Sequence, residues 1–174
     1  MKILLYVCFV AAVLKSSASA CFSTPAEQIV SPEALVARTK QIVLARVVKA
    51  EADFKTSDVT YSFVVDQTVK GENPKIFTIV GASLFYPEDL TTFDYHRSER
   101  FWKQDAGRCQ HDTDCVIHPA FAVGDTYLIF VDGPYHRKSF ERIVMLGKEA
   151  DTRDKWLVWV ENNVKAQQDA PSNR

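Results

Sequence analysis

The alternation of apolar and polar residues along the chain predicts a mainly β protein. β-branched residues fill most of the run 42–48, which is typical of a largely buried strand. Between residues 59 and 69 apolar side chains tend to fall at every second position, as they do in a strand with one face on a core. Five strands are expected in all, over residues 42–48, 59–69, 75–80, 126–131 and 139–146.

Two helices are expected to flank these strands. Ser31-Pro32-Glu33 offers a hydroxyl N-cap, a proline in the first turn and a carboxylate at the positive end of the helix dipole. A short helix should therefore follow and end near Lys40. A second helix should begin at Asp151 or Thr152. Its apolar residues recur on one face: Trp156, Leu157, Val160 and Val164.

This order of elements predicts a small β-barrel. The turn Asp132-Gly133-Pro134 should join the last two strands as a hairpin. We expect a five-stranded OB-type Greek-key barrel with a short N-terminal helix, a C-terminal helix and one long loop, because closure removes exposed strand edges. An open α+β sheet is the alternative.

The long loop is the aperiodic segment 82–120. Loops of this length tend to be functional or to pack on themselves. Four of its aromatic residues are candidates for partner binding: Phe93, Tyr95, Phe101 and Trp102. They alternate with Arg97, Arg100 and Lys103, a composition typical of recognition surfaces. The alternative is that the aromatic rings form a small core of the loop itself.

The first twenty residues have the pattern of a secretory signal peptide. Lys2 precedes an apolar run from Ile3 to Leu14, which is too short to span a bilayer, and Ala18-Ser19-Ala20 offers the small residues of a cleavage site. The sequence therefore predicts an exported protein, secreted from the cell or held in the periplasm or cell envelope. The expected domain is 21–166, followed by a polar tail at 167–174.

The charge of the chain argues against nucleic acid as a partner. Loss of the signal peptide removes Lys2 and Lys15 from the 21 basic residues, which leaves 19 basic and 22 acidic residues and a net charge of −3. A chain of this balance has no strong positive field for a polyanion. The mature length of 154 residues suits a single domain with its own core.

Export makes the cysteines informative, because disulfides persist in oxidising compartments. The mature chain keeps three of them: Cys21, Cys109 and Cys115. A disulfide between Cys109 and Cys115, which would close the long loop, is favoured over pairing of either with Cys21. Cys21 is then lipidated, bonded to another molecule or free. A membrane is a partner only if Cys21 is lipidated.

Catalytic and metal-binding patterns are weak. His96, His111 and His118 lie in or near the long loop but show no paired spacing typical of zinc, and Asp112-Thr113-Asp114 lacks the rest of a calcium loop. No Gly-x-Ser-x-Gly elbow is present, and His136 falls in the hairpin turn. We therefore predict no enzyme activity, no bound metal and no cofactor. A metal-dependent or hydrolytic enzyme that uses the 82–120 loop is the competing hypothesis.

Several short phrases, taken in order, carry a family resemblance. A mature N-terminal cysteine, a short helix and Gln41-Ile42-Val43-Leu44-Ala45-Arg46-Val47 come before a strand end at Val69-Lys70-Gly71. The phrase Val123-Gly124-Asp125-Thr126-Tyr127-Leu128-Ile129-Phe130 is similar to a core strand of the same family. The chain resembles the tissue inhibitors of metalloproteinases and related netrin-like modules, as a divergent member.

The resemblance implies a function for the N-terminus. In the inhibitors of that family the α-amino group and carbonyl of the first cysteine chelate the catalytic zinc of a protease. The resemblance makes Cys21 the chelator and Phe22 the residue that fills the neighbouring pocket. Ser23 stands where the inhibitors repeat a cysteine. The disulfides that hold the N-terminus in that family are mostly absent.

We therefore expect an exported, non-catalytic binding module that engages a protein partner. The partner could be a metalloprotease, which would supply its zinc in trans. The expected contact residues are Cys21, Phe22, Ser23, Phe93, Tyr95, Phe101 and Trp102. A structural envelope lipoprotein anchored at Cys21 is a further alternative.

Overall fold

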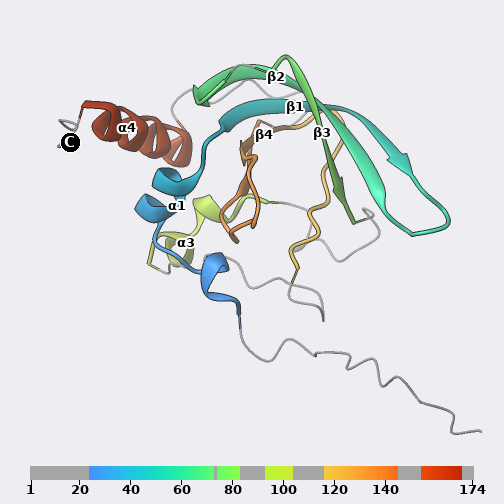
Figure 1. Ribbon diagram of the computed structural model, residues 1–174, viewed down its shortest axis with the longest axis horizontal. Helices are drawn as coiled ribbons and strands as arrows, with labels where there is room; N and C mark the ends of the chain where they lie inside the picture. Colours follow the sequence, from blue (N-terminus) through green and yellow to red (C-terminus); the bar gives the residue numbers. More distant parts are fainter. Residues whose placement is uncertain (1–23, 73, 83–92, 104–115, 145–153, 170–174) are drawn as a thin grey trace, which may run out of the picture.

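A computed structural model describes residues 24–72, 74–82, 93–103, 116–144 and 154–169 of the protein (Figure 1). The strands are β1 (Ile42–Ala52), β2 (Val59–Lys70), β3 (Ile76–Gly81), β4 (Thr126–Phe130) and β5 (Phe140–Val144). The α-helices are α1 (Pro32–Arg38), α3 (Glu99–Lys103) and α4 (Lys155–Asp169), and two 3₁₀ turns are η1 (Ala26–Gln28) and η2 (Tyr95–Arg97). The expected mainly β fold with five strands is confirmed.

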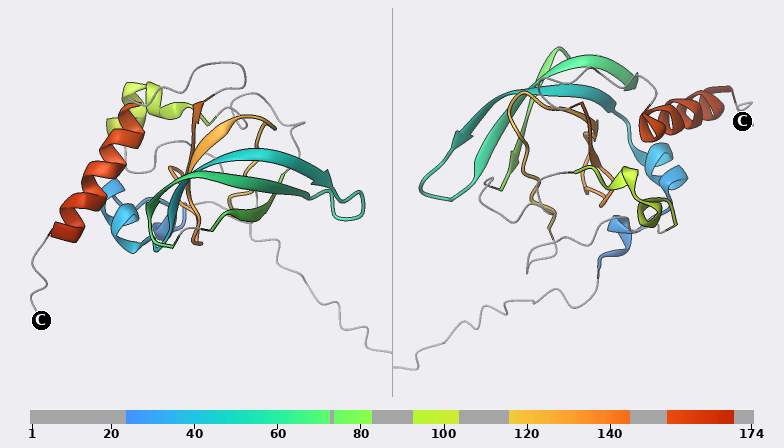
Figure 2. Two further views of the ribbon diagram at one scale, coloured as in Figure 1. Left: turned by 90° about the horizontal axis from the view of Figure 1, so that it is seen from above. Right: turned by 180° about the vertical axis from the view of Figure 1, so that it is seen from behind.

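The five strands form one antiparallel sheet in the order β3-β2-β1-β4-β5. β1 lies in the middle because it is long enough to pair with β2 over its whole length and with β4 over residues 42–46. Its pairing with β2 shifts register at three places, and such bulges increase the local twist. The sheet accordingly curls, with β1 and β2 arching over the rest of the domain (Figures 1 and 2).

The expectation of a closed barrel is wrong. In the described part of the chain β3 and β5 are the two edges of the sheet and do not pair with each other. Just after β3, the backbone N–H of Ala82 donates to the carbonyl of Pro119, and in β5 the N–H of Arg142 donates to the carbonyl of Phe93. A Cβ on Gly81 would lie 1.8 Å from the Pro119 oxygen, so this position cannot carry a side chain. Pro119 and Phe93, from the long segment between β3 and β4, thus accept hydrogen bonds from backbone N–H groups at the two sheet edges. In a closed barrel these edges would pair with each other.

The alternation of side chains along β1 divides the interior into two cores. Val43, Ala45 and Val47 point into the curl of the sheet, where they meet the aromatic rings of β2, β4, β5 and residue 121. Ile42 and Leu44, which alternate with Val43 and Ala45 along the strand, point to the opposite face of the sheet. There they pack against a second core that also contains residues of α1, α3 and α4.

The two expected helices, α1 and α4, follow the sequence pattern closely, whereas α3 lies in the segment where no helix was expected. Ser31 caps α1 by accepting a hydrogen bond from Ala34 N at 3.2 Å, as expected. α4 is capped by Asp154, not by Asp151 or Thr152, because the Asp154 carboxylate accepts from the backbone N–H groups that follow it. Its expected apolar face is confirmed, since the four predicted residues are buried. α4 continues to Asp169 and so includes residues 167–169 of the expected tail.

Helices α1 and α4 lie side by side at one end of the sheet (Figures 1 and 2). None of the helices in the described ranges has the length and apolarity needed to cross a membrane. The expected signal peptide (residues 1–20), Cys21–Ser23 and the Cys109–Cys115 disulfide lie outside the described residues.

Candidate functional site

Two of the four aromatic residues expected to bind a partner are buried in the domain. Phe93, with a positive φ of 44°, reaches the core inside the curled sheet and contacts the rings of Phe121 and Phe140. Phe101, from α3, lies in the second core and meets the ring of Trp156 edge to face at 5.0 Å. Their rings are 4% and 0% exposed, so they anchor the segment 93–103 on the domain.

The other two aromatic residues lie nearer the surface. Tyr95 is half-buried against the second core. Trp102 is 39% exposed, and its indole N–H donates to the carbonyl of His96 at 2.7 Å. Its ring also meets that of Trp156, with the centroids 5.8 Å apart. Trp102 is therefore a partly exposed ring in a fixed orientation.

Between these aromatic residues, η2 carries a buried histidine held by two carboxylates. His96 is 3% exposed. Its Nδ1 lies 2.8 Å from Oε2 of Glu141 in β5, and its Nε2 lies 2.8 Å from Oδ2 of Asp154 at the start of α4. The backbone N–H of His96 donates to the same Glu141 oxygen. This single side chain thus ties the long segment to the sheet edge and to the C-terminal helix.

The charges around His96 decide its protonation state. Burial favours the neutral imidazole, but the hydrogen bonds and charges of Asp154 and Glu141 outweigh it and raise the pKa of His96 to about 9. Burial would likewise raise the pKa of Asp154, but the bond to His96 and the backbone N–H groups of α4 lower it. An ionised carboxylate only accepts hydrogen bonds, so both ring nitrogens must donate. His96 is an imidazolium at neutral pH.

This arrangement is unsuited to acid–base catalysis. A general base needs one unprotonated nitrogen within reach of a substrate. Both nitrogens of His96 are bound to protein carboxylates, and the ring is buried. His96 therefore stabilises the fold.

A second buried histidine lies in the β4–β5 hairpin, at the N-terminal segment. His136 is fully buried; its Nε2 lies 2.9 Å from the carbonyl of Val30, and its Nδ1 accepts from the backbone N–H of Lys138 at 2.9 Å. The neighbouring Arg137 donates to the hydroxyl of Thr24. From the other side, Arg38 donates to the carbonyl of Pro134 at 3.1 Å. The hairpin thus holds residues 24–38 through three separate hydrogen bonds.

His136 has the opposite charge state to His96. Burial, together with the positive charges of Lys138, Arg38 and Arg137, lowers the pKa of His136 to about 4, against the effect of its bond to Val30. The ring is neutral at physiological pH, with its proton on Nε2, because Nδ1 accepts.

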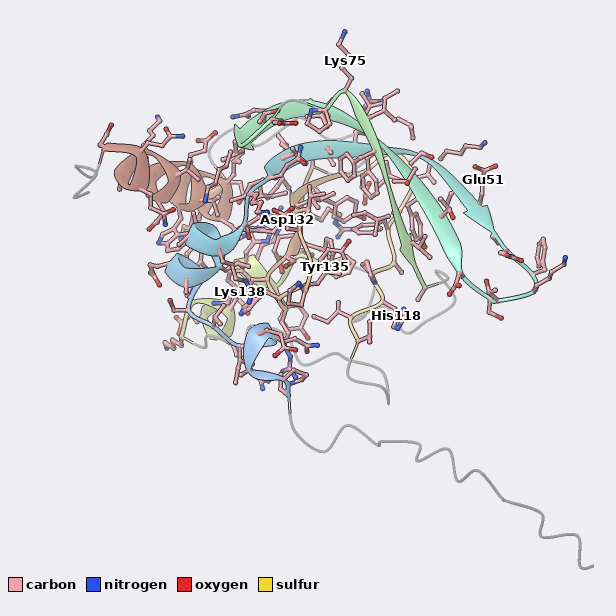
Figure 3. The ribbon with its side chains drawn as sticks, viewed as in Figure 1. Glu51, Lys75, His118, Asp132, Tyr135 and Lys138 are labelled. Carbon is pink, nitrogen blue, oxygen red and sulfur yellow. The ribbon has the colours of Figure 1, made fainter. Side chains whose placement is uncertain are left out.

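Residues 136–138 also contact α3. The ammonium of Lys138 lies 4.7 Å from the centroid of the Phe101 ring, a cation–π contact, and Lys138 is 1% exposed. Figure 3 shows Lys138 between the N-terminal helices and α3. Since Arg137 holds Thr24 and Lys138 holds Phe101, the N-terminal segment and α3 lie on the same side of the domain.

A shallow open depression of about 330 Å³ adjoins η2, lined by Asp94, Tyr95, Arg97 and Ser98. Asp94 also pairs with Arg142 at 3.4 Å, and Arg142 reaches the buried Asp125 at 3.2 Å. Within the described residues no group of three or more His, Cys, Asp or Glu side chains is placed to bind a metal ion. His111, Asp112 and Asp114 lie outside them.

Sequence reasoning singled out His96 and His136 but not their partners. Glu141 and Asp154 lie 45 and 58 positions from His96, so no local spacing reveals the contact. One signal was present: a carboxylate two residues before the apolar face of a helix is a typical N-cap. No known protein-family model matches this sequence, and no curated protein is significantly similar to it.

Proposed function

We propose that the protein is an exported, non-catalytic binding module that engages a protein partner through its N-terminal segment and the neighbouring face of α3. A metalloprotease, whose zinc the Cys21 amine and carbonyl would chelate, is the partner chemistry that best suits such an N-terminus. The sheet is proposed to be an OB-type barrel opened between β3 and β5. Its order, with β1 between β2 and β4, supports this assignment.

One observation carries the proposal: the β4–β5 hairpin joins the two segments expected to bind the partner. Arg137 bonds to Thr24, three residues after Cys21, and Lys138 packs on Phe101, next to the exposed Trp102. A partner bound at the N-terminus would therefore lie within reach of α3.

The hairpin also supplies a restraint that the missing disulfides would otherwise give. A flexible recognition segment loses conformational entropy on binding, which weakens the complex. His136 and Arg137 hold Val30 and Thr24 before any partner arrives. Preorganisation of the residues that follow Cys21 supports a binding role without the cysteine-rich N-terminus of the inhibitors.

The non-catalytic part of the proposal is supported by the two buried histidines. Each has both ring nitrogens engaged within the protein, His96 by carboxylates and His136 by backbone groups. Neither is placed to accept a proton from a substrate.

The test is inhibition of a panel of secreted zinc metalloproteases by protein whose N-terminus is Cys21. A matched variant carries one additional alanine before Cys21, which moves the α-amino group away from the zinc. We expect the native N-terminus to inhibit at least one protease and the extended variant to lose that inhibition, while both unfold at the same urea concentration.

Four outcomes contradict the proposal. Equal inhibition by both forms excludes chelation by Cys21, and absence of inhibition across the panel excludes the metalloprotease partner. Metal-dependent hydrolysis by the protein itself would support the enzyme hypothesis. If Cys21→Ser only releases the protein from membranes, the lipoprotein hypothesis stands.

A further inference from the structure

β3 is an edge strand whose outer side is open in the described part of the chain. It pairs with β2 on one side, and no strand of the described residues pairs with its other side. Its exposed residues include two apolar ones, Ile76 and Val80, which are 66% and 58% exposed. Proteins usually protect such an edge with a charged residue or a proline inside the strand, but β3 contains neither. The edge is therefore available to another strand.

The pairing of β3 with β2 determines which of its backbone groups are open. Along an antiparallel pair, residues bonded to the neighbouring strand alternate with residues whose N–H and C=O point away from it. The N–H of Val65 in β2 donates to the carbonyl of Lys75 at 3.1 Å, so Lys75 and every second residue after it face β2. The backbone groups of the residues between, Ile76, Thr78 and Val80, point to the open edge. Their side chains also share the outer, exposed face of the strand.

These three open residues are self-complementary. A β-branched apolar residue stands on each side of a central threonine. If two copies met antiparallel across a two-fold axis through Thr78, the two threonines would face each other, and Ile76 of each copy would face Val80 of the other. Each facing pair would exchange both of its backbone hydrogen bonds. Pairs of β-branched residues and of threonines stabilise neighbouring strands.

The residues at the two ends of β3 exclude other registers. A slide of the second strand by two residues in one direction places Pro74, which has no N–H, opposite an open residue. A slide in the other direction places Ala82 there, and its N–H already donates to the carbonyl of Pro119 at 3.0 Å. A slide by one residue sets open groups against groups that are bonded within the sheet. Only the register centred on Thr78 uses all the open groups of both copies.

We propose that β3 pairs with β3 of a second copy of this chain, so that the two sheets join across a two-fold axis. Such a dimer covers both open edges at once. The chain has a net charge of only −1, so long-range repulsion between copies is weak. Lys75 points away from the domain (Figure 3), and the two Lys75 residues would lie at opposite ends of the strand pair. The β3 edge shares no residue with the N-terminal segment or α3, so this dimer is independent of the proposed function.

The test is sedimentation equilibrium of the mature chain from about 10 µM to about 1 mM, because a small interface of one strand pair predicts a weak, reversible dimer. We expect a monomer–dimer equilibrium that dissociates on dilution. Thr78→Pro removes an open N–H that makes no bond to β2 and places a ring in the joint, so it should abolish the dimer in this range. The matched control, Thr78→Val, keeps the N–H and the shape and should change the Kd by less than about threefold.

Two charge substitutions test the register. Ile76→Lys and Val80→Glu each introduce a charge into both apolar contacts of a self-dimer, so each should raise the dimer Kd roughly tenfold. In a mixture of the two variants, the introduced lysine of one copy faces the introduced glutamate of the other. The mixed dimer should therefore regain most of the native affinity. Both native side chains are exposed, so urea unfolding midpoints of the variants should match that of the native protein.

The proposal is overturned if the chain stays monomeric up to about 1 mM, which would leave the edge to a strand of a different protein. A dimer that Thr78→Pro does not weaken, or a mixed dimer no tighter than the two self-dimers, also contradicts it. So does a dimer that survives dilution and separates only on reduction, since a cysteine would link it. Protease inhibition enters none of these measurements, so failure here leaves the proposed function standing.

The reverse also holds. A reversible dimer that depends on Thr78, in a protein that inhibits no protease, would remove the proposed function and leave the β3 interface.

Discussion

The two buried histidines make a natural comparison, because burial is the same and the neighbours differ. His96 and His136 are 3% and 0% exposed, and each uses both ring nitrogens. His96 meets two carboxylates, and its pKa is raised to about 9; His136 meets backbone groups amid three cations, and its pKa is lowered to about 4. Burial alone favours the neutral ring at both sites, so the neighbouring charges set the difference.

The comparison also explains how the candidate binding face, formed by the N-terminal segment and α3, is held on the rest of the domain. The charged ring of His96 fixes η2, next to Trp102, on β5 and α4. The neutral ring of His136 fixes the N-terminal segment on the β4–β5 hairpin. Stability of both attachments should therefore respond to pH in opposite directions.

The largest expected effect is that of His96→Leu. The substitution leaves the carboxylates of Glu141 and Asp154 buried together without their shared cation, and removal of one partner from a buried ion pair destabilises by about 3–5 kcal/mol. Urea unfolding at about pH 6.5 measures this loss. The matched control is His118→Leu at an exposed histidine, which should change stability by less than about 1 kcal/mol. Equal losses in the two variants would show that the carboxylates do not depend on His96.

The loss of stability at alkaline pH should be nearly as large as the loss caused by His96→Leu. The folded pKa of His96, about 9, lies above the ordinary value of 6.5, so its contribution is complete below about pH 6.5 and is lost as pH rises through 9. The native protein should lose about 3 kcal/mol of unfolding free energy over this window. The His96→Leu variant should not show this alkaline loss of stability. A loss of equal size in the variant would mean that another group causes it.

His136→Gln should have a smaller effect at neutral pH. The glutamine amide can replace only one of the two ring contacts, so we expect a loss of about 1–2 kcal/mol. Because the folded pKa is lowered to about 4, the contribution of His136 is present above pH 6.5 and is lost as pH falls through 4. The stability of the variant should therefore fall less steeply than that of the native protein as the pH is lowered from 6.5 to 4, as followed by circular dichroism. An unchanged acid limb would mean that His136 is already protonated in the fold.

The smallest effect is expected for Lys103→Ala, which removes an ion pair from the surface. Lys103 and Glu99 are 2.7 Å apart, but their side chains are 72% and 86% exposed. Exposed pairs of this spacing contribute about 0.3–0.5 kcal/mol. Thermal unfolding should place the variant within about 2 °C of the native protein. A loss comparable with that of His96→Leu would contradict the distinction between buried and exposed pairs.

The sheet could be predicted from the sequence, but its edges could not. β-branched runs and alternation marked all five strands, since each strand carries its own burial pattern. Closure depends on which residues meet the outer strands. Those residues, Phe93 and Pro119, lie in the aperiodic segment 82–120. The helix α3 is only five residues long, too short for its periodicity to be visible.

The candidate site could be predicted only in part, because its contacts, like the edges of the sheet, depend on residues far apart in the sequence. The aromatic residues of the segment stood out, but Phe93 and Phe101 lie in the two cores of the domain and not in a core of the loop itself. Trp102 is partly exposed, and its part in partner binding stays a prediction. The pairing of His96 with Glu141 and Asp154 depends on the tertiary fold, which no local pattern encodes. The role of Cys21 and Phe22 stays a prediction.

The charge states of the two histidines are tested most directly by ¹⁵N NMR of the imidazole rings at neutral pH. The chain has four histidines, which substitution of each in turn assigns. We predict that both ring nitrogens of His96 carry protons, whereas His136 shows one protonated nitrogen, Nε2, and one bare nitrogen, Nδ1. A bare nitrogen on His96 would contradict its attachment to Glu141 and Asp154, and two protonated nitrogens on His136 would contradict its attachment to Val30 and Lys138.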